Sequence, residues 1–306
     1  MITDKGRIIH PPEYGMAITL KPIFYRPPPE AYSLILMPTI GCPWNRCVFC
    51  GTHKDEKYFP RPLNDVLEDI ILAKNYYGDK VKRVFLAEAN TIALKVEKLL
   101  KILDVLYKCF PKLERVSCYG GAKFIKGRRK DLKMLGEAGL NKIYMGLESG
   151  DDEVLRLMEK GVTSKDMIEA AEIVKDANIK LSVTVIQGLA GAEKWEKNAE
   201  LTAKTINQMK PDEVRLHSLI IHPKAPLHKL VLEGKFKEAS WYEILLETKK
   251  LIENINIQCF IINHASHYLI PGLIHGNLPS DKELLLTTID SALLNPEVFV
   301  QKIRRL

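Results

Sequence analysis

Six short runs rich in β-branched and aromatic residues alternate with stretches of helical periodicity along most of this 306-residue chain. The runs span residues 33–40, 82–86, 115–119, 142–147, 180–186 and 213–220, and the helical stretches span 63–77, 96–109, 128–138, 164–177, 196–209 and 241–255. The runs are not joined by tight hairpin turns, so consecutive strands are expected to pair in parallel through right-handed helical crossovers. The alternation therefore predicts an α/β fold, a partial (βα)6 TIM-like barrel of parallel strands.

The flanks of this alternating region differ from it. Residues 1–32 are rich in proline, which favours extended backbone, and we expect this segment to lie extended on the surface. After the last helical stretch come another short apolar run at 258–262, a turn-rich segment and a closing helix at 281–294. The chain is thus predicted to have three parts: an N-terminal segment at 1–32, a barrel at 33–225 and a C-terminal extension at 226–306 that packs on the barrel.

Composition and charge limit the class of protein. Apolar residues make up 46% of the chain and charged residues 27%, which is typical of a soluble globular domain. Apolar stretches fall well short of the roughly 18 residues that span a membrane, and residues 1–10 lack the apolar core of a signal peptide, so we expect a cytoplasmic protein without a membrane partner. The net charge of +7 comes from 45 basic and 38 acidic residues that are interleaved, and a nucleic-acid partner is not indicated.

Three of the six cysteines, Cys42, Cys47 and Cys50, lie on one loop directly after the first predicted strand, at the end where parallel barrels carry their chemistry. Three thiolates on one loop suit a four-iron four-sulfur (4Fe–4S) cluster whose fourth iron is open to another ligand. A structural zinc ion needs a fourth ligand, for which His53 is the nearest residue, and such sites usually pair two loops of this kind. The spacing favours the cluster and leaves zinc and unligated thiols as alternatives. The other cysteines stand alone in the sequence: Cys109, Cys118 and Cys259.

The cysteine loop, with Phe49 just before its last cysteine, resembles that of the radical S-adenosylmethionine (SAM) superfamily, and the resemblance extends over residues 33–225. Four residues separate Cys42 from Cys47, one more than the common spacing of that superfamily. The resemblance implies that Cys42, Cys47 and Cys50 bind one 4Fe–4S cluster, that SAM binds beside it, and that a low-potential donor such as ferredoxin or flavodoxin supplies an electron. It further implies an oxidoreductase-like enzyme that cleaves SAM to a 5'-deoxyadenosyl radical, which takes a hydrogen atom from a substrate that the sequence does not identify.

The same resemblance implies which residues bind the methionine end of SAM. Glu88 follows the second predicted strand, where superfamily members carry a glycine-rich turn with a carboxylate that meets the ammonium group. Both glycines are missing here, and a solvated carboxylate is the alternative. The segment at 144–163 resembles a branch that includes tRNA methylthiotransferases and coproporphyrinogen-oxidase-like proteins. By that likeness Glu148 and Ser149 approach the ribose or amino-acid end and Lys160 pairs with the methionine carboxylate, whereas the alternative makes Lys160 a cation stabilised by a helix C-terminus.

The resemblance also implies that the adenine end of SAM lies against the fifth and sixth predicted strands. Ser182 lies on the fifth strand, and Gly188 in the turn after it lets the backbone approach the adenine because it has no Cβ. His217 and Ser218 lie at the mouth of the sixth strand, where they are expected to contact the adenine or the substrate. A structural role is the alternative for His217. Phe49 completes the predicted cofactor-binding set.

The segment at 263–268 follows the short apolar run at 258–262. If that run forms a strand parallel to the sixth one, the donors and acceptors of this segment face the substrate, and His264 and Tyr268 are candidate catalytic residues. Turn chemistry also favours Asn and Ser, so a hydrogen-bonded turn is the alternative.

Two other functions remain open from the sequence. A non-catalytic cofactor or haem chaperone on the same fold would bind a cluster without productive SAM turnover. A zinc-binding module, the more distant alternative, would contain one zinc ion in place of the cluster.

Overall fold

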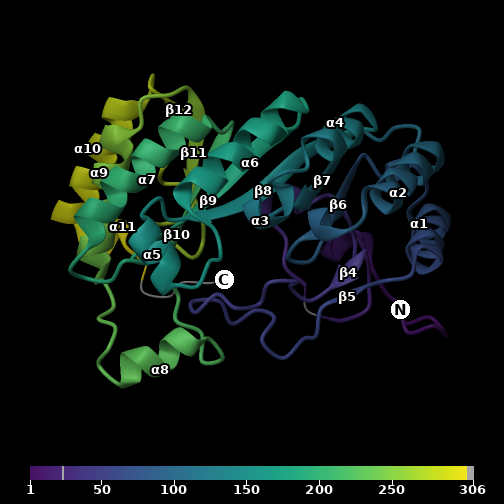
Figure 1. Ribbon diagram of the computed structural model, residues 1–306, viewed down its shortest axis with the longest axis horizontal. Coiled ribbons are helices and arrows are strands. Elements are labelled where there is room, and N and C mark those ends of the chain that lie inside the picture. Colours follow the sequence, from purple (N-terminus) through teal and green to yellow (C-terminus); the bar gives the residue numbers. More distant parts are fainter. Residues whose placement is uncertain (23, 302–306) are drawn as a thin grey trace. The chain divides into compact units, whose positions relative to one another are not determined.

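The computed structural model describes residues 1–22 and 24–301 and divides into two compact units (Figure 1). The first unit comprises Met1–Pro43, Asp55–Tyr144 and Ile173–Lys180, and the second comprises Trp44–Lys54, Met145–Glu172 and the described part of Leu181–Leu306. The chain passes from one unit to the other several times, once within strand β8 (Leu140–Glu148).

The strands of the first unit lie side by side in the order β1, β2, β3, β6, β7 and β8. Their bounds are β1 Ile8–His10, β2 Ala17–Thr19, β3 Leu34–Leu36, β6 Arg83–Leu86, β7 Arg115–Tyr119 and β8 as given above. All neighbours in this order are parallel except β1 and β2. The short strands β4 (Thr39–Ile40) and β5 (Phe59–Pro60) form a separate antiparallel pair. Because the pairing is parallel, the carboxyl ends of β3, β6 and β7 lie at one edge, where Leu36 is level with Leu86 and Leu86 with Cys118.

The strands of the second unit lie side by side in the order β9 (Lys180–Gln187), β10 (Glu213–Ser218), β11 (Cys259–Asn263) and β12 (His275–Leu278). β10 is parallel to both β9 and β11, and β12 is antiparallel to β11. The predicted seventh strand therefore does run parallel beside the sixth. Ser218 is level with Gln187, and Leu216 with Asn263, so the residues that follow these three strands lie at one edge.

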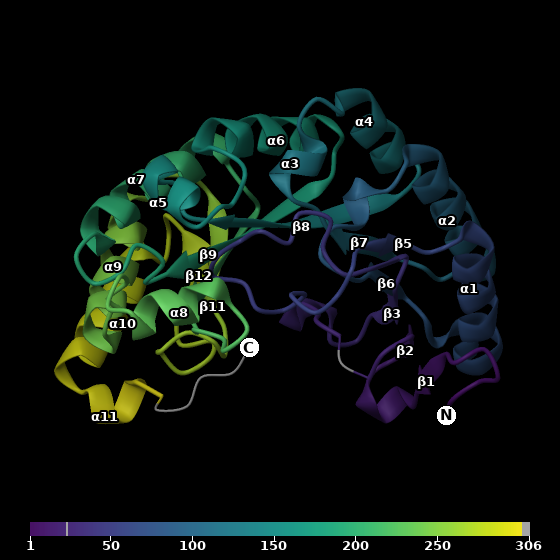
Figure 2. The same ribbon diagram turned by 60° about the horizontal axis from the view of Figure 1, so that its bottom comes forward.

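The α-helices of the described residues include all the predicted helical stretches. In the first unit they are α1 Leu63–Tyr77, α2 Val96–Cys109, α3 Ala122–Ile125 and α4 Arg129–Glu137; in the second they are α5 Asp152–Leu157, α7 Trp195–Met209, α8 Pro226–Leu232, α9 Trp241–Asn254, α10 Lys282–Leu294 and α11 Pro296–Phe299; α6 (Ser164–Asp176) has residues in both. The predicted stretches appear as α1, α2, α4, α6, α7, α9 and α10, and the structure adds four short helices among the described residues, α3, α5, α8 and α11. Figure 2 shows α1, α2 and α4 along one side of the strands of the first unit. α2 buries the stripe Leu99, Leu103 and Leu106. Ser240 and Glu243 start α9 with a capping box, each side chain bonding the backbone N–H of the other.

None of the helices in the described ranges combines the length and apolar character that a bilayer span requires.

One expectation about the N-terminal segment was wrong. Residues 17–19 do not lie on the surface but are buried as β2, which pairs with β1 on one side and with β3 on the other. Three residues in a proline-rich context are too few to show strand periodicity, so this strand leaves no signal in the sequence. The division of the chain at residues 32 and 225 stays a prediction.

A buried carboxylate ties the N-terminal segment to the sheet of the first unit. Glu30 is fully buried and accepts hydrogen bonds from the Ser33 hydroxyl, from the Tyr144 hydroxyl at 2.6 Å and from Arg115 Nη2 at 2.9 Å. Burial by itself raises the pKa of Glu30, but the hydrogen bonds and the guanidinium charge of Arg115 outweigh it and hold the pKa below its ordinary value. Glu30 is therefore an ionised, satisfied core group.

Replacing Tyr144 by Phe is expected to lower the free energy of unfolding by about 1.5–3 kcal/mol at neutral pH, because a buried carboxylate loses a charge-assisted donor. A carboxylate whose pKa is lowered by folding stabilises the protein above its unfolded pKa, and this contribution is lost as the pH falls through the folded pKa. The difference between the two proteins should therefore shrink in acid. Urea unfolding measured across pH checks this, with Tyr32→Phe as the control because Tyr32 is 84% exposed. A pH-independent difference would contradict this account of Glu30.

Candidate functional site

The cysteine loop begins after β4, and the boundary between the two units falls within it, between Pro43 and Trp44. In the first unit, Asn90 Nδ2 lies 4.0 Å from Cys42 Sγ. The preceding Gly41 has a φ of +72°, and a Cβ there would lie 3.2 Å from the Lys57 carbonyl oxygen, so the entry to the loop requires glycine. Its N–H donates to Glu88 Oε2 at 2.8 Å, which links the start of the loop to the end of β6.

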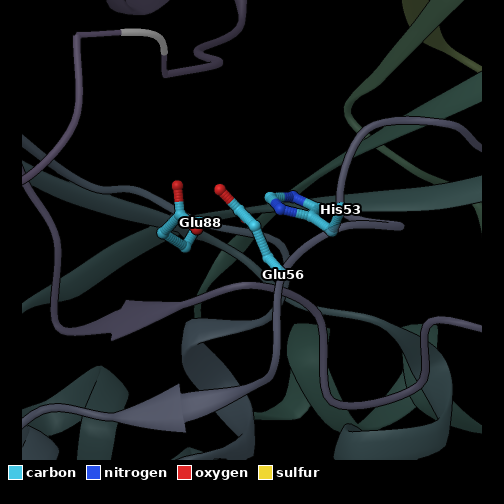
Figure 3. Close-up of side chains that lie close together, drawn as sticks. All are labelled: His53, Glu56 and Glu88. Carbon is cyan, nitrogen blue, oxygen red and sulfur yellow. The ribbon is translucent and has the colours of Figure 1, made fainter.

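Glu88 is a buried carboxylate with an ammonium partner. Lys21 Nζ lies 3.2 Å from Glu88 Oε2 and 2.6 Å from Glu56 Oε1. Figure 3 shows the carboxylates of Glu56 and Glu88, whose oxygens approach within 4.8 Å of each other. The alternative of a solvated carboxylate at position 88 was wrong, because the side chain is buried and paired. Lys21 was missed from the sequence, since nothing in the sequence relates it to a residue 67 positions away.

In the second unit, the rest of the cysteine loop is held by backbone contacts. The Val48 N–H donates to the Met158 carbonyl, and the Val48 carbonyl accepts from the Leu227 N–H, each at 2.9 Å. The Val48 side chain belongs to an apolar cluster that includes Met158 and Leu227. Trp44 Nε1 donates to the Glu159 carbonyl at 2.8 Å. These contacts fix Cys47 and Cys50, on either side of Val48, against the segment that follows α5.

Lys160 lies where the loop and the end of β8 meet. Its Nζ is 2.7 Å from Glu148 Oε1 and 5.9 Å from the centre of the Phe49 ring. Burial lowers the pKa of Lys160, but Glu148, Cys47 and Cys50 together outweigh burial and raise the pKa above its ordinary value. The second unit thus brings together five of the predicted site residues around one charged ammonium group.

A pocket of about 160 Å³ opens beside Cys50 in the second unit. It is formed by the cysteine loop, by the ends of β9 and β10 and by one residue after β11, and its lining is Phe49, Cys50, Gly51, Thr52, Thr184, Ile186, His217, Ser218, Leu219, Ile220, His222 and Ser266. The lining combines apolar and aromatic side chains with hydroxyl and imidazole groups. The pocket therefore suits a partly polar ligand.

A chain of hydrogen bonds behind the pocket starts at Arg215, and the donor in each bond can be assigned. Arg215 only donates, and its Nε lies 2.9 Å from His264 Nε2 while its Nη2 lies 3.5 Å from His217 Nε2. Burial and the Arg215 charge lower the pKa of His264 to about 3 and the pKa of His217 well below its ordinary value, so both rings are neutral. A neutral ring that accepts at Nε2 carries its proton on Nδ1. His217 Nδ1 therefore donates to Ser266 Oγ at 2.6 Å, and the Ser266 hydroxyl can donate into the pocket.

Three predicted cofactor residues lie in buried hydrogen bonds outside the lining of this pocket. The Ser149 hydroxyl donates to Asn198 Oδ1 at 2.5 Å and accepts from the Asp151 N–H at 2.9 Å. The Ser182 hydroxyl donates to Glu213 Oε1 at 3.2 Å. Gly188 has a φ of +81° and donates its N–H to a carboxylate on α9. Ser149 and Gly188 follow the ends of β8 and β9, whereas Ser182 lies near the start of β9, level with the first residue of β10.

The segment after β11 divides into a structural and a pocket-facing part. Asn263 Nδ2 donates to the carbonyls of Leu269 and Ile270 at 3.0 Å, and Asn263 Oδ1 accepts from the Ile274 N–H at 2.8 Å, so this residue closes a turn. Ser266 instead lines the pocket, and His264 lies behind the pocket as the buried partner of Arg215. Tyr268 is partly exposed, and its N–H donates to the Ser218 hydroxyl at 3.3 Å.

Comparison with known proteins gives a family and a fold. The sequence profile of the radical SAM superfamily matches residues 36–199, more than half of the chain. The chain is 26% identical over 276 residues to 4'-phospho-dehydrooxetanocin synthase from Priestia megaterium, covering 83% of this chain and 34% of that protein. It is 23% identical over 220 residues to the heme chaperone HemW from Bacillus subtilis, covering 65% of this chain and 55% of that protein. The chain therefore spans about a third of the first curated relative and just over half of the second.

Among solved structures, coproporphyrinogen III oxidase (HemN) from Escherichia coli aligns with a TM-score of 0.56 at 17% identity, covering 73% of this chain and 52% of that chain. At this identity the likeness concerns the fold. It confirms the predicted α/β class with a mostly parallel, TIM-barrel-like sheet.

The tautomers behind the pocket can be tested directly. At about pH 5, where an ordinary histidine is largely protonated, His264 and His217 should stay neutral with the proton on Nδ1, because burial and Arg215 disfavour the imidazolium. Nitrogen-detected NMR of labelled histidine, assigned with His264→Gln and His217→Gln, reports both charge and tautomer. An imidazolium signal, or a proton on Nε2, would contradict the direction of hydrogen bonding assigned to Ser266.

Proposed function

The chain belongs to the radical SAM superfamily, and we propose that it is an enzyme that cleaves SAM reductively and removes a hydrogen atom from an unidentified substrate. Members of this family bind a 4Fe–4S cluster and SAM, and these are the cofactors of the chain. The observation that carries the proposal is the group of Cys47, Cys50, Phe49, Glu148 and Lys160 beside the pocket of the second unit.

The chemistry of the thiols fits the cluster. All six cysteines are free thiols, and Cys42, Cys47 and Cys50 are partly exposed on one loop. Cys259 is buried, which raises its pKa to about 12 and disfavours the thiolate that a metal requires. Cys42, Cys47 and Cys50 would therefore hold the cluster, which when bound supplies a low-potential electron and an open iron site for the amino acid end of SAM.

The charged groups of each unit suit one end of the methionine part of SAM. In the second unit, Lys160 keeps its charge and is proposed to bind the carboxylate through a charge-assisted hydrogen bond. In the first unit, Glu88 accepts a hydrogen bond from the ammonium group of Lys21. We propose that the ammonium group of SAM takes the place of Lys21 as the donor to Glu88. Glu148 is proposed to orient Lys160 toward this end of the ligand.

The pocket of the second unit is proposed to hold the adenosine part. Phe49 and Ile186 offer an apolar surface for the adenine ring, and Ser266 offers a donor to an acceptor atom of adenosine. Apolar walls also limit access of water and of other hydrogen donors. The substrate is proposed to approach past His264 and Tyr268, after the end of β11, and a ferredoxin or flavodoxin in the cytoplasm is proposed as the electron donor.

One experiment separates the functions. The protein is purified without oxygen, its iron, sulfide and zinc are measured, and it is reduced in the presence of SAM with 5'-deoxyadenosine as the readout. The proposal expects a cluster and 5'-deoxyadenosine. A cluster that binds SAM without cleaving it would support a non-catalytic cofactor or haem chaperone, and one zinc with no iron would support a zinc-binding module.

Alanine at Cys42, Cys47 or Cys50 is expected to abolish retention of iron and sulfide and formation of 5'-deoxyadenosine, because each thiolate is one of only three protein ligands proposed for the cluster. Cys109→Ser and Cys259→Ser should leave both quantities unchanged and serve as controls. Full cluster content in Cys47→Ala would overturn the assignment.

Lys160→Ala is expected to weaken SAM binding by about 1.5–3 kcal/mol, the usual value of a hydrogen bond to a charged group, while iron content stays at the wild-type level. The matched control is Lys165→Ala, which removes an exposed lysine at the start of α6. Binding is measured by equilibrium dialysis of the reconstituted protein. SAM affinity unchanged by Lys160→Ala would leave this lysine as the partner of Glu148 alone.

A further inference from the structure

A single buried carboxylate on α9 receives hydrogen bonds from two directions. Glu247 is 1% exposed, its Oε2 accepts from the Gly188 N–H at 2.7 Å, and its Oε1 accepts from Asn198 Nδ2 at 2.6 Å. Burial raises the pKa of Glu247 to about 7, while these two hydrogen bonds act in the opposite direction. This residue had no role in the sequence-based predictions, because an acidic residue in an amphipathic helix is usually a surface group.

The hydrogen bonds continue from Glu247 to the end of β8. Asn198 on α7 is fully buried, and its Oδ1 accepts from the Ser149 hydroxyl at 2.5 Å. The Ser149 hydroxyl in turn accepts from the Asp151 N–H at 2.9 Å. At a pH above the Glu247 pKa of about 7, the ionised carboxylate only accepts, so Asn198 presents its amino group to Glu247 and its oxygen to Ser149. One path therefore joins the turn after β9 to the turn after β8.

Both turns adopt backbone that needs outside support or special residues. Glu148 has a φ of +63°, an uncommon conformation for a residue with a side chain, and Gly188 has a φ of +81°. The side chain of Glu148 bonds Lys160 Nζ, so the backbone angle at Glu148 sets the direction from which the carboxylate reaches that ammonium group. The hydrogen bonds of Ser149, the next residue, hold the backbone in this form.

We propose that Glu247 and Asn198 are positioning residues for SAM, which fix the Glu148–Lys160 pair and the Gly188 turn relative to each other. This inference rests on the proposed function, since SAM is the ligand that the two turns would share. Neither residue lines the pocket, so their effect is exerted through the turns.

The test exchanges donors and acceptors along the path. Glu247→Gln sets an amino group against either the Gly188 N–H or the Asn198 amino group. If Asn198 flips in response, its amino group donates to the Ser149 hydroxyl, and the buried hydroxyl proton of Ser149 loses its acceptor. The double variant Glu247→Gln/Asn198→Asp restores every pairing: the new amide accepts from Gly188 and donates to the new carboxylate, which still accepts from Ser149. A role limited to packing would not distinguish the single variant from the double one in SAM affinity.

The dissociation constant for SAM is measured on the full chain after anaerobic reconstitution, together with iron content and melting temperature. Glu247→Gln should weaken SAM binding about tenfold with iron content unchanged, since one buried hydrogen bond is replaced by a mismatch. The double variant should regain affinity to within about threefold of the wild type.

The matched control is Asn207→Leu. Asn207 on α7 also links to the end of α9, by bonds to the Asn254 carbonyl and the Asn256 N–H at 2.8 Å, but this link reaches neither turn. Asn207→Leu removes these two hydrogen bonds, which should lower the melting temperature and leave SAM affinity unchanged. If Glu247→Gln does not fold, Ser149→Ala cuts the path at its other end, and a severalfold loss of SAM affinity is expected there.

The proposal is overturned if a folded Glu247→Gln or, in its place, Ser149→Ala binds SAM like the wild type. It is also overturned if the double variant folds without regaining affinity, or if Asn207→Leu weakens SAM binding equally. Failure of the wild-type holoprotein to bind SAM would instead overturn the proposed function, and that result is seen before any variant is compared.

Discussion

Parallel pairing of strands is the constraint on which the functional residues depend. In each unit the parallel strands end at one edge, so side chains from distant parts of the sequence meet after those ends. Glu88 follows β6 in the first unit. In the second unit, His217 lies near the end of β10, and Ser266 follows β11, and the two are hydrogen-bonded. An antiparallel arrangement of the same elements would send neighbouring strand ends to opposite edges.

In each unit, a strand is followed or ended by a glutamate with positive φ that pairs with a lysine. Glu88 and Glu148 both have positive φ, at 77° and 63°, and each pairs with a lysine, Lys21 in the first unit and Lys160 in the second. Left-handed backbone is unfavourable for residues with a side chain, so surrounding contacts have to hold it. At Glu88, hydrogen bonds from the Gly41 N–H and from Lys21 Nζ hold the backbone in this conformation. At Glu148 the support comes from the lysine and from the buried polar path through the following serine.

Much of the fold was predictable because helices and strands show a local periodicity of apolar residues in the sequence. The helical stretches and five of the six strands appear within a few residues of their predicted bounds, since an amphipathic helix shows its period over several turns and a buried strand shows a continuous apolar run. The first predicted strand, 33–40, is instead divided into β3 and β4, which belong to different sheets. β2 was not predictable, because three buried residues give no period. The number and spacing of the thiols predict a metal site at the cysteine loop, and this stays a prediction. The ammonium partner of Glu88 was not predictable, because a salt bridge carries no sequence pattern.

The sequence by itself determined the class of fold, the position of the cysteine loop and the family, because these depend on residues close together in the chain. Only the tertiary structure decided which side chains surround Lys160, which way the hydrogen bonds run from Arg215 through His217, and that Glu247 reaches Gly188. The longest of these contacts join residues far apart in the chain, 49 positions between His217 and Ser266 and 59 between Gly188 and Glu247. The physical reason is that hydrogen bonds and ion pairs act over a few ångströms in space, and the distance in space between such residues is set by how the strands and helices pack rather than by their separation in sequence.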